Sequence, residues 1–365
     1  MIQKHNPINP TLFDRVREKF FYSSTATGIT VVAVFFMAVI FAYLLDWGVL
    51  NAVFRADSNV CYEAHGACWG FVTEKWRLII FGRFPYAEQW RPALATLAIV
   101  VMLFITAMPR FWNRKGKIVL LWGWVAAFAI FFVLMYGGLF GLSKVETDSW
   151  GGLPLTVILT LLGMAVSTPI GILLALGRRS QLPITRLLCT GYIELVRGVP
   201  LITVLFVASF VFPLLLPSGI RIDPFWRVTG GIILFQAAYM AETVRGGLQT
   251  VQKGQFLAAD SLGLSTIQKY VSVILPQALV AVIPSFVNNL LSTFMDTSLV
   301  TVVSMFDLTG SLQLALGDAQ WRDFFREGYI FVAAIYFFCS LAMSRYSQWL
   351  EKRLQTVDHT TERRR

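Results

Sequence analysis

The chain has 365 residues, of which 56% are hydrophobic and 14% are charged. Its mean hydropathy of +0.63 lies well above that of an ordinary soluble domain and indicates an integral membrane protein. The net charge of +10 is assigned to membrane topology and to contact with anionic lipid headgroups, and not to nucleic acid.

Apolar runs close to the ~20 residues that cross a bilayer as a helix recur along the chain, without the two-residue alternation of an outer-membrane barrel. We therefore expect an all-α integral membrane protein with about eight transmembrane helices. The first span is too long for a signal-peptide core and is read as a retained anchor. Pro200 is expected to bend the long fifth span. The predicted spans are residues 27–49, 93–109, 118–141, 152–176, 186–215, 228–247, 272–296 and 327–349.

The distribution of Lys and Arg predicts the orientation of these spans. Most of the 31 basic residues lie in segments 1–26, 110–117, 177–186, 245–271 and 345–365. The positive-inside rule therefore places both termini in the cytoplasm.

The loops divide the chain near residue 150. Residues 1–150 hold three spans and a long outside loop, residues 151–350 hold five spans with ordered Gly and Pro positions, and residues 351–365 form a basic tail. Cys61 and Cys68 fall in the long outside loop, where an oxidising compartment permits a disulfide, with two free thiols as the alternative. The three histidines all lie outside the spans and far apart, so no metal site within the membrane is predicted.

The stretch between the sixth and seventh spans turns polar on the cytoplasmic side. Residues 254–262 are compatible with a short helix on which Phe256, Ala259 and Leu262 share a face. The small side chains of Ala258 and Ala259 leave that helix flat enough for another body to approach closely. A docking helix for a cytoplasmic partner is therefore favoured over an amphipathic helix on lipid, because Ala and Ser bury little apolar area.

The residues after this helix predict a hinge and a second helix. Gly263 suits the left-handed position just past a helix end. Ser265 and Gln268 have the spacing of a capping box, and Pro276 is expected to kink the helix that follows.

Charged residues at the ends of spans are costly and tend to be paired or functional. Glu194 with Arg197, and Glu242 with Arg245, are each three residues apart and can meet on a helix, while Asp296 ends the seventh span. One interpretation is structural pairing that anchors helix ends. The other is that Arg197 and Asp296 line or gate a path for a zwitterionic substrate, whose carboxylate and ammonium attract opposite charges.

The segment "AADSLGLSTIQKYVSVILP" (258–276) resembles the loop motif of permease subunits of ATP-binding-cassette (ABC) importers. The family's opening glutamate is replaced here by Leu257. The matching positions are Ala258, Ala259, Gly263, Val273, Leu275 and Pro276.

Three further segments resemble signatures of the polar amino-acid subgroup of these permeases: "IELVRGVPLITVLF" (193–206), "AETVRGGLQTVQKGQ" (241–255) and "DTSLVTVVSMFDL" (296–308). Met295 stands where relatives usually carry lysine. With the three additional spans before residue 150, the whole chain resembles one permease subunit of the bacterial general L-amino-acid importers.

The resemblance implies a type I ABC importer permease core in the last five helices, located in the bacterial inner membrane, with the long outside loop in the periplasm. The cytoplasmic loop 248–271 would carry a coupling helix that docks an ATPase. The coupling residues implied are Gln255, Phe256, Ala258, Ala259 and Gly263. The residues implied for the translocation path or gate are Glu194, Arg197, Glu242, Arg245, Asp296 and Thr297.

The resemblance also implies a homologous permease subunit, a dimer of ATPase subunits that holds ATP and Mg, and a periplasmic amino-acid-binding protein as partners. The chain itself is not expected to be an enzyme or to bind a cofactor. Its one Gly-Lys pair, Gly116-Lys117, follows Phe111 and precedes Ile118, which does not match a phosphate-binding loop.

Two alternatives stay open at the level of sequence. An assembly subunit would dock the ATPase without contacting substrate. A secondary transporter is disfavoured, because no ionisable group lies at a span centre. The sequence leaves open which amino acids are carried.

Overall fold

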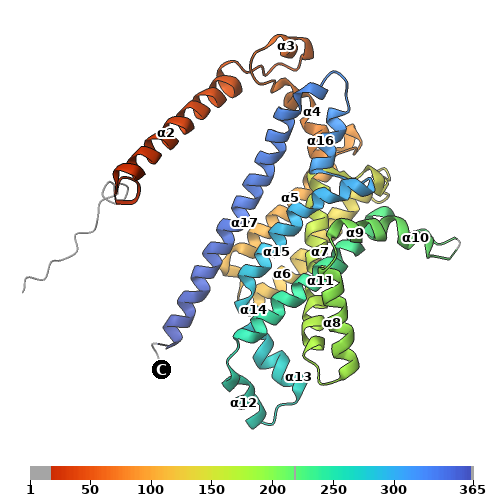
Figure 1. The fold of residues 1–365 in the computed structure, drawn as a ribbon. Helices are drawn as coiled ribbons and strands as arrows, with labels where there is room; N and C mark the ends of the chain where they lie inside the picture. The colour runs from red at the N-terminus through yellow and green to blue at the C-terminus, as the bar shows by residue number, and fades with distance from the viewer. Residues whose placement is uncertain (1–17, 218, 363–365) are drawn as a thin grey trace, which may run out of the picture. The chain divides into compact units, whose positions relative to one another are not determined.

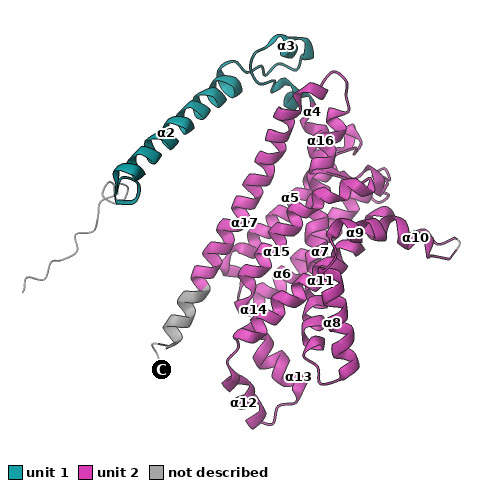
Figure 2. Cartoon of the chain, in the orientation of Figure 1, with its two compact units in different colours: residues 1–74 teal, residues 75–365 magenta. Residues whose placement is uncertain are grey.

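The computed structural model describes residues 18–362 apart from 218, with side chains described as far as residue 353. His5, residues 363–365 of the basic tail and the side chain of His359 lie outside this described part. The chain forms two compact units, residues 1–74 and residues 75–365 (Figure 2). Each unit is described by itself.

The first unit begins with the predicted anchor. Helix α2 (Ser24–Leu45) is capped by Ser23, continues into the π-helical turn Asp46–Leu50, and has no buried residue of its own (Figure 1). Helix α3 (Ser58–Glu63) follows. Because α2 is apolar on every side and unburied by its own chain, it has the surface of a helix that lies in lipid.

The small loop after α3 is closed covalently. Cys61 and Cys68 form a disulfide with their Cα atoms 5.5 Å apart, and both are buried. Trp69 adds a 2.8 Å hydrogen bond from its indole Nε1 to the carbonyl of Gly48, so the loop is tied back to the end of the anchor.

Helix α4 joins the two units, and the rest of the second unit is a bundle of helices around one long parallel pair (Figure 1). The helices are α4 (Gly70–Phe81), α5 (Trp90–Ala107), α6 (Arg114–Tyr136), α7 (Gly152–Arg178), α8 (Pro183–Arg197), α9 (Leu201–Phe206), α10 (Phe212–Leu214), α11 (Pro224–Thr250), α12 (Lys253–Ser261), α13 (Thr266–Gln268), α14 (Leu275–Ala281), α15 (Ile283–Asp296), α16 (Leu308–Leu316) and α17 (Phe325–Glu362). The short strand β1 (Phe306–Asp307) pairs with the residues that open α7.

Helices α7 and α11 form the most extensive contact in the bundle. They run in the same direction, since Gly163 of α7 lies against Ile232 and Gly171 lies against Met240. A Cβ atom on Gly171 would come within 3.0 Å of the carbonyl oxygen of Ala237. Small residues therefore let the two backbones approach closely, as is common between helices in membranes.

Among the described residues, the helices that could cross a membrane fall short of the predicted eight even when broken helices are joined. Within the described residues, five helices are long and apolar enough to cross a membrane, and two bent pairs raise the total to seven. The remaining predicted span, 228–247, lies inside α11, which has 27 residues but is not among these candidate spans.

The two bent pairs break at identifiable residues. Helix α8 and the segment Leu201–Leu214 meet at 104°, and the break contains Pro200 as expected. The second pair bends by 59° between Ala281 and Ile283. At Pro276, a π-helical turn immediately precedes α14, and its wider backbone accommodates a residue that has no N–H to donate. The kink expected at Pro276 stays a prediction.

Helices α5 and α6 belong to the same compact unit as the later helices. Aromatic rings connect α6 to the later helices. Trp150 lies edge-on to Phe225 of α11 with ring centroids 5.1 Å apart, and Phe132 of α6 contacts both rings. The predicted boundary at residue 150 therefore stays a prediction about where a permease core begins, whereas the compact units divide at residue 74.

Candidate substrate path and docking loop

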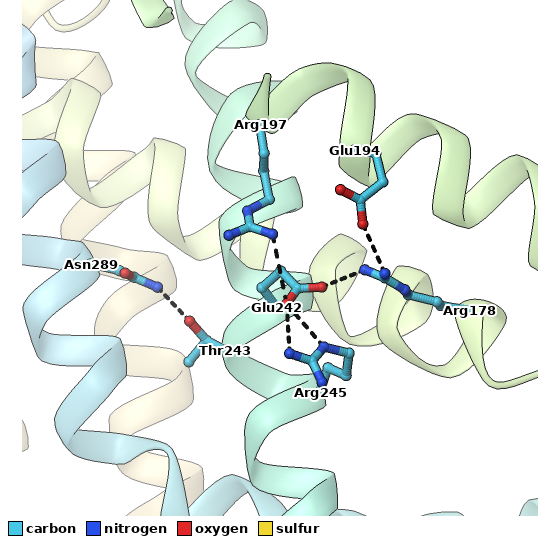
Figure 3. Close-up of polar contacts among 7 residues, drawn as sticks. All are labelled: Arg178, Glu194, Arg197, Glu242, Thr243, Arg245 and Asn289. Atoms are coloured by element: carbon cyan, nitrogen blue, oxygen red, sulfur yellow. Dashed lines mark hydrogen bonds and ion pairs between the residues drawn. The ribbon is translucent and has the colours of Figure 1, made fainter. Parts of the chain in front are cut away.

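Five charged side chains from three helices meet where α7 ends (Figure 3). We call them the Arg–Glu cluster: Arg178 of α7, Glu194 and Arg197 of α8, and Glu242 and Arg245 of α11. Arg178 contacts Glu242 at 2.5 Å and Glu194 at 2.8 Å. Arg245 contacts Glu242 at 2.9 Å, and Arg197 lies 3.7 Å from the same carboxylate. Three arginines face two glutamates, so the cluster carries one net positive charge.

Local packing brings Arg178 into this cluster. A Cβ atom on Gly177 would lie 2.4 Å from the sulfur of Cys189, so α7 and α8 touch at that point without room for a larger side chain. This close approach lets the guanidinium of Arg178 reach both glutamates.

One predicted pair forms and the other does not. Glu242 and Arg245 pair as expected. The predicted pair of Glu194 with Arg197 is wrong, because Glu194 bonds Arg178 across helices and Arg197 turns toward Glu242, its guanidinium 5.6 Å from the ring centre of Tyr239. Spacing along one helix could not reveal Arg178, which lies 64 residues from its partner Glu242.

Asp296 and Thr297 lie at the second helix junction. Asp296 ends α15 and is partly buried, and Thr297 is buried and begins the 3₁₀ turn Thr297–Val303. That turn packs against α9, directly after the break at Pro200. In the described residues no ion pair or hydrogen bond joins Asp296 to the Arg–Glu cluster.

A cavity of about 420 Å³ lies beside the cluster, between α11 and the α14–α15 junction. Asn289 of α15 donates a 2.9 Å hydrogen bond to the hydroxyl of Thr243, one of the residues that line the cavity (Figure 3). The lining residues are Glu242, Thr243, Gly246, Gly247, Thr250, Ala281, Val282 and Ser285. The cavity is thus lined mostly by small side chains and is partly polar, with Glu242 among its lining residues.

The candidate docking loop, residues 248–271, has the predicted local structure. Helix α12 covers most of the predicted helix 254–262, and Gly263 adopts the left-handed backbone with φ of 68°. Ser265 and Gln268 form the capping box, with the Ser265 N–H donating to the side-chain Oε1 of Gln268 at 2.9 Å. Lys269 pairs with Asp260 at 2.6 Å across the hinge.

The faces of α12 differ from the prediction. Ala259 is buried and Phe256 is partly buried, with the Arg179 guanidinium 5.7 Å from its ring centre. Leu262 is 78% exposed and does not share their face, because α12 ends at Ser261. The outward surface of α12 and its C-cap is instead formed by Leu257, Ala258 and Leu262, while Gln255 is partly buried.

A family model described as "Binding-protein-dependent transport system inner membrane component" matches residues 167–356, which is more than half of the chain. The chain belongs to this family.

Two relatives match almost the whole permease. The inner membrane amino-acid ABC transporter permease protein YhdY of Escherichia coli (strain K12) is 44% identical over 344 residues, which is 93% of this chain and 92% of the relative. The glutamate/glutamine/aspartate/asparagine transport system permease protein BztC of Rhodobacter capsulatus is 35% identical over 94% of each chain.

A solved structure, described as an amino acid ABC transporter with histidines, is 31% identical with a TM-score of 0.50 and covers 55% of this permease and 92% of that chain. The resemblance seen in the loop motifs is therefore confirmed, as is an all-α type I permease core. The chain is a permease subunit of an ABC importer.

Proposed function

We propose that this permease carries L-amino acids across the bacterial inner membrane, forms half of the translocation path, and has both termini in the cytoplasm. The observation that carries the proposal is the near full-length likeness to the amino-acid permease YhdY. The four amino acids in the description of BztC have a carboxylate and an ammonium in common. A zwitterion of that kind is the substrate class that the charged residues of this chain suit.

In this proposal Arg197 receives the substrate carboxylate. The Arg–Glu cluster has one more cation than anions, and Arg197 is the arginine held most loosely, at 3.7 Å from its partner and with 37% of its side chain exposed. A guanidinium presents paired donors that match a carboxylate. Asp296, beside the neighbouring helix junction, is proposed to face the ammonium, with Thr297, Glu242 and Arg245 as further path or gate residues.

The outward surface of α12 is proposed to dock an ATPase. Leu257 and Leu262 are 68% and 78% exposed, and the small side chain of Ala258 between them lets a partner approach closely. Gln255, Phe256, Ala259 and Gly263 are proposed to shape that loop from within. A dimer of ATPase subunits would hold ATP and Mg, and a homologous permease and a periplasmic amino-acid-binding protein would complete the complex.

The docking experiment uses the tagged permease extracted gently from its native membrane, with mass spectrometry of what accompanies it. Ala258→Arg places a charge on the outward surface of α12 and is expected to release the ATPase. The control Gln252→Arg adds the same charge at an exposed position before α12 and is expected to retain it. Retention of the ATPase by Ala258→Arg would contradict docking through this surface and favour a helix lying on lipid.

The transport experiment measures uptake of radiolabelled L-glutamine by membrane vesicles that contain the complete complex. Arg197→Gln is expected to lower uptake and to weaken the preference for L-glutamine over its α-amide, which lacks the carboxylate. Unchanged uptake and unchanged preference would contradict a role for Arg197 and favour an assembly subunit that does not contact substrate.

A further inference from the structure

We propose that Arg178 is a positioning residue that keeps Arg197 available for substrate. By occupying Glu194 and Glu242, it prevents these carboxylates from capturing the Arg197 guanidinium. This inference rests on the proposed role of Arg197 in binding the carboxylate.

The first step of the argument is the geometry of Arg178. One guanidinium nitrogen, Nη1, donates to Glu242 at 2.5 Å, and the other, Nη2, donates to Glu194 at 2.8 Å. The planar group thus bridges two helices with one nitrogen for each carboxylate. A lysine ammonium is a single point charge and does not present this fork.

The second step is the competition that Arg178 relieves. Glu194 precedes Arg197 by three residues on α8, a spacing at which the two side chains can pair. Glu242 already bonds Arg245 and lies 3.7 Å from Arg197. With Arg178 removed, two arginines would face two glutamates, and the vacated oxygens would attract Arg197.

The third step is charge. The cluster now has one net positive charge, which a substrate carboxylate can neutralise. Without Arg178 the net charge is zero, so a carboxylate would have to displace a glutamate from Arg197. The Glu242 side chain is only 16% exposed, so water screens this competition incompletely.

The position of Arg178 is fixed by packing as well as by charge. The contact of Gly177 with Cys189 holds the end of α7 against α8. The neighbouring Arg179 points elsewhere, toward Phe256 and the carbonyl of Leu248. The two adjacent arginines therefore have different partners, and only Arg178 reaches the two glutamates.

The test uses the complete complex in membrane vesicles, with L-glutamine uptake and competition by its α-amide as readouts. Arg178→Gln is expected to lower uptake about tenfold, the scale of one charge-assisted hydrogen bond. Adding Glu194→Gln restores the net positive charge and removes one competitor for Arg197. The double variant is therefore expected to recover most of the uptake and the preference for the free carboxylate.

Arg186→Gln is the matched control. Arg186 is exposed in the first turn of α8, and its Nε donates a 3.1 Å hydrogen bond to the carbonyl of Ser180. It is expected to transport like the wild type. Amounts of assembled complex are compared by recovery of the ATPase with each variant.

Each outcome has a distinct meaning. If the double variant is as slow as Arg178→Gln at equal assembly, Arg178 only ties the helices together and the inference is overturned. If Arg178→Gln transports normally, the inference is overturned as well. If Arg197→Gln itself keeps normal uptake and selectivity, the proposed role of Arg197 fails first, and the inference falls with it.

Discussion

The phenol of Tyr336 on α17 donates a 3.0 Å hydrogen bond to the carboxylate of Asp307, which is fully buried at the start of α16. Asp307 also accepts 2.8 Å from the N–H of Gly310 and 3.3 Å from the hydroxyl of Thr301. One carboxyl group thus caps α16 and joins it to α17 and to the turn that follows α15.

This carboxyl group predicts a pH dependence of stability. Burial raises the pKa of Asp307 above its ordinary value, against the opposing effect of its hydrogen bonds. A raised pKa in the folded state stabilises the fold below the unfolded pKa of about 4, and this stabilisation is lost as pH rises through the folded pKa.

The measurement is thermal unfolding of the purified complex at a series of pH values, for the wild type and Asp307→Asn. The wild type is expected to lose stability relative to Asp307→Asn as pH rises from about 4 through the raised pKa. A difference in melting temperature between the two that stays constant with pH would contradict the raised pKa.

The docking loop shows how much local sequence can predict. Gly263 and the pair of Ser265 with Gln268 were placed correctly, because caps and left-handed positions depend on neighbours within a few residues. The inward face of Ala259 is not predictable in this way, since it depends on how α12 packs against the π-helical turn Lys269–Ile274.

The Arg–Glu cluster shows where prediction stops. Glu242 and Arg245 lie one helical turn apart, so their pairing follows from spacing. Arg178 reaches Glu242 only because α7 and α11 run side by side, and a single sequence carries no spacing that reports such a contact. Because Arg178 bonds both glutamates, it determines which carboxylate oxygens are left for Arg197 and Arg245.

Arg91 is expected to be essential for the stability of the α5–α6 hairpin. Its side chain is fully buried, pairs with Glu88, and donates 2.6 Å to the carbonyl of Leu134 and 3.0 Å to that of Ser143. Arg91→Ala leaves the carbonyls without this donor and is expected to cost about 1–3 kcal/mol, the scale of a buried hydrogen-bonding group left unsatisfied.

Thermal unfolding of the purified complex measures this loss, with Arg110→Ala as the control. Arg110 is exposed in the turn after α5, so its removal is expected to change stability by less than about 0.5 kcal/mol. Equal melting temperatures for the two variants would show that the buried contacts of Arg91 contribute nothing measurable.

Gly263 is expected to be required for the conformation of the docking loop. Its φ of 68° costs a residue with a side chain about 1–2 kcal/mol, although a Cβ atom there would meet no neighbour. Gly263→Ala is therefore expected to weaken ATPase recovery. Gly254→Ala, in open space within α12, is the control and should leave recovery intact. Equal ATPase recovery from both variants would mean that docking does not need the left-handed backbone at Gly263.

The parallel contact of α7 with α11 depends on Gly171. A Cβ atom at this position would lie 2.5 Å from the Met240 Cβ and 3.0 Å from the Ala237 carbonyl oxygen, so Gly171→Ala must push the two helices apart. Overpacking of this kind is expected to destabilise the permease by about 1–3 kcal/mol. Gly230→Ala is the matched control, because Gly230 also lies within a long helix, α11, but has open space around its Cβ position. Thermal unfolding should separate the two variants. A Gly171→Ala variant as stable as Gly230→Ala would mean that α7 and α11 can shift to admit a methyl group at little cost.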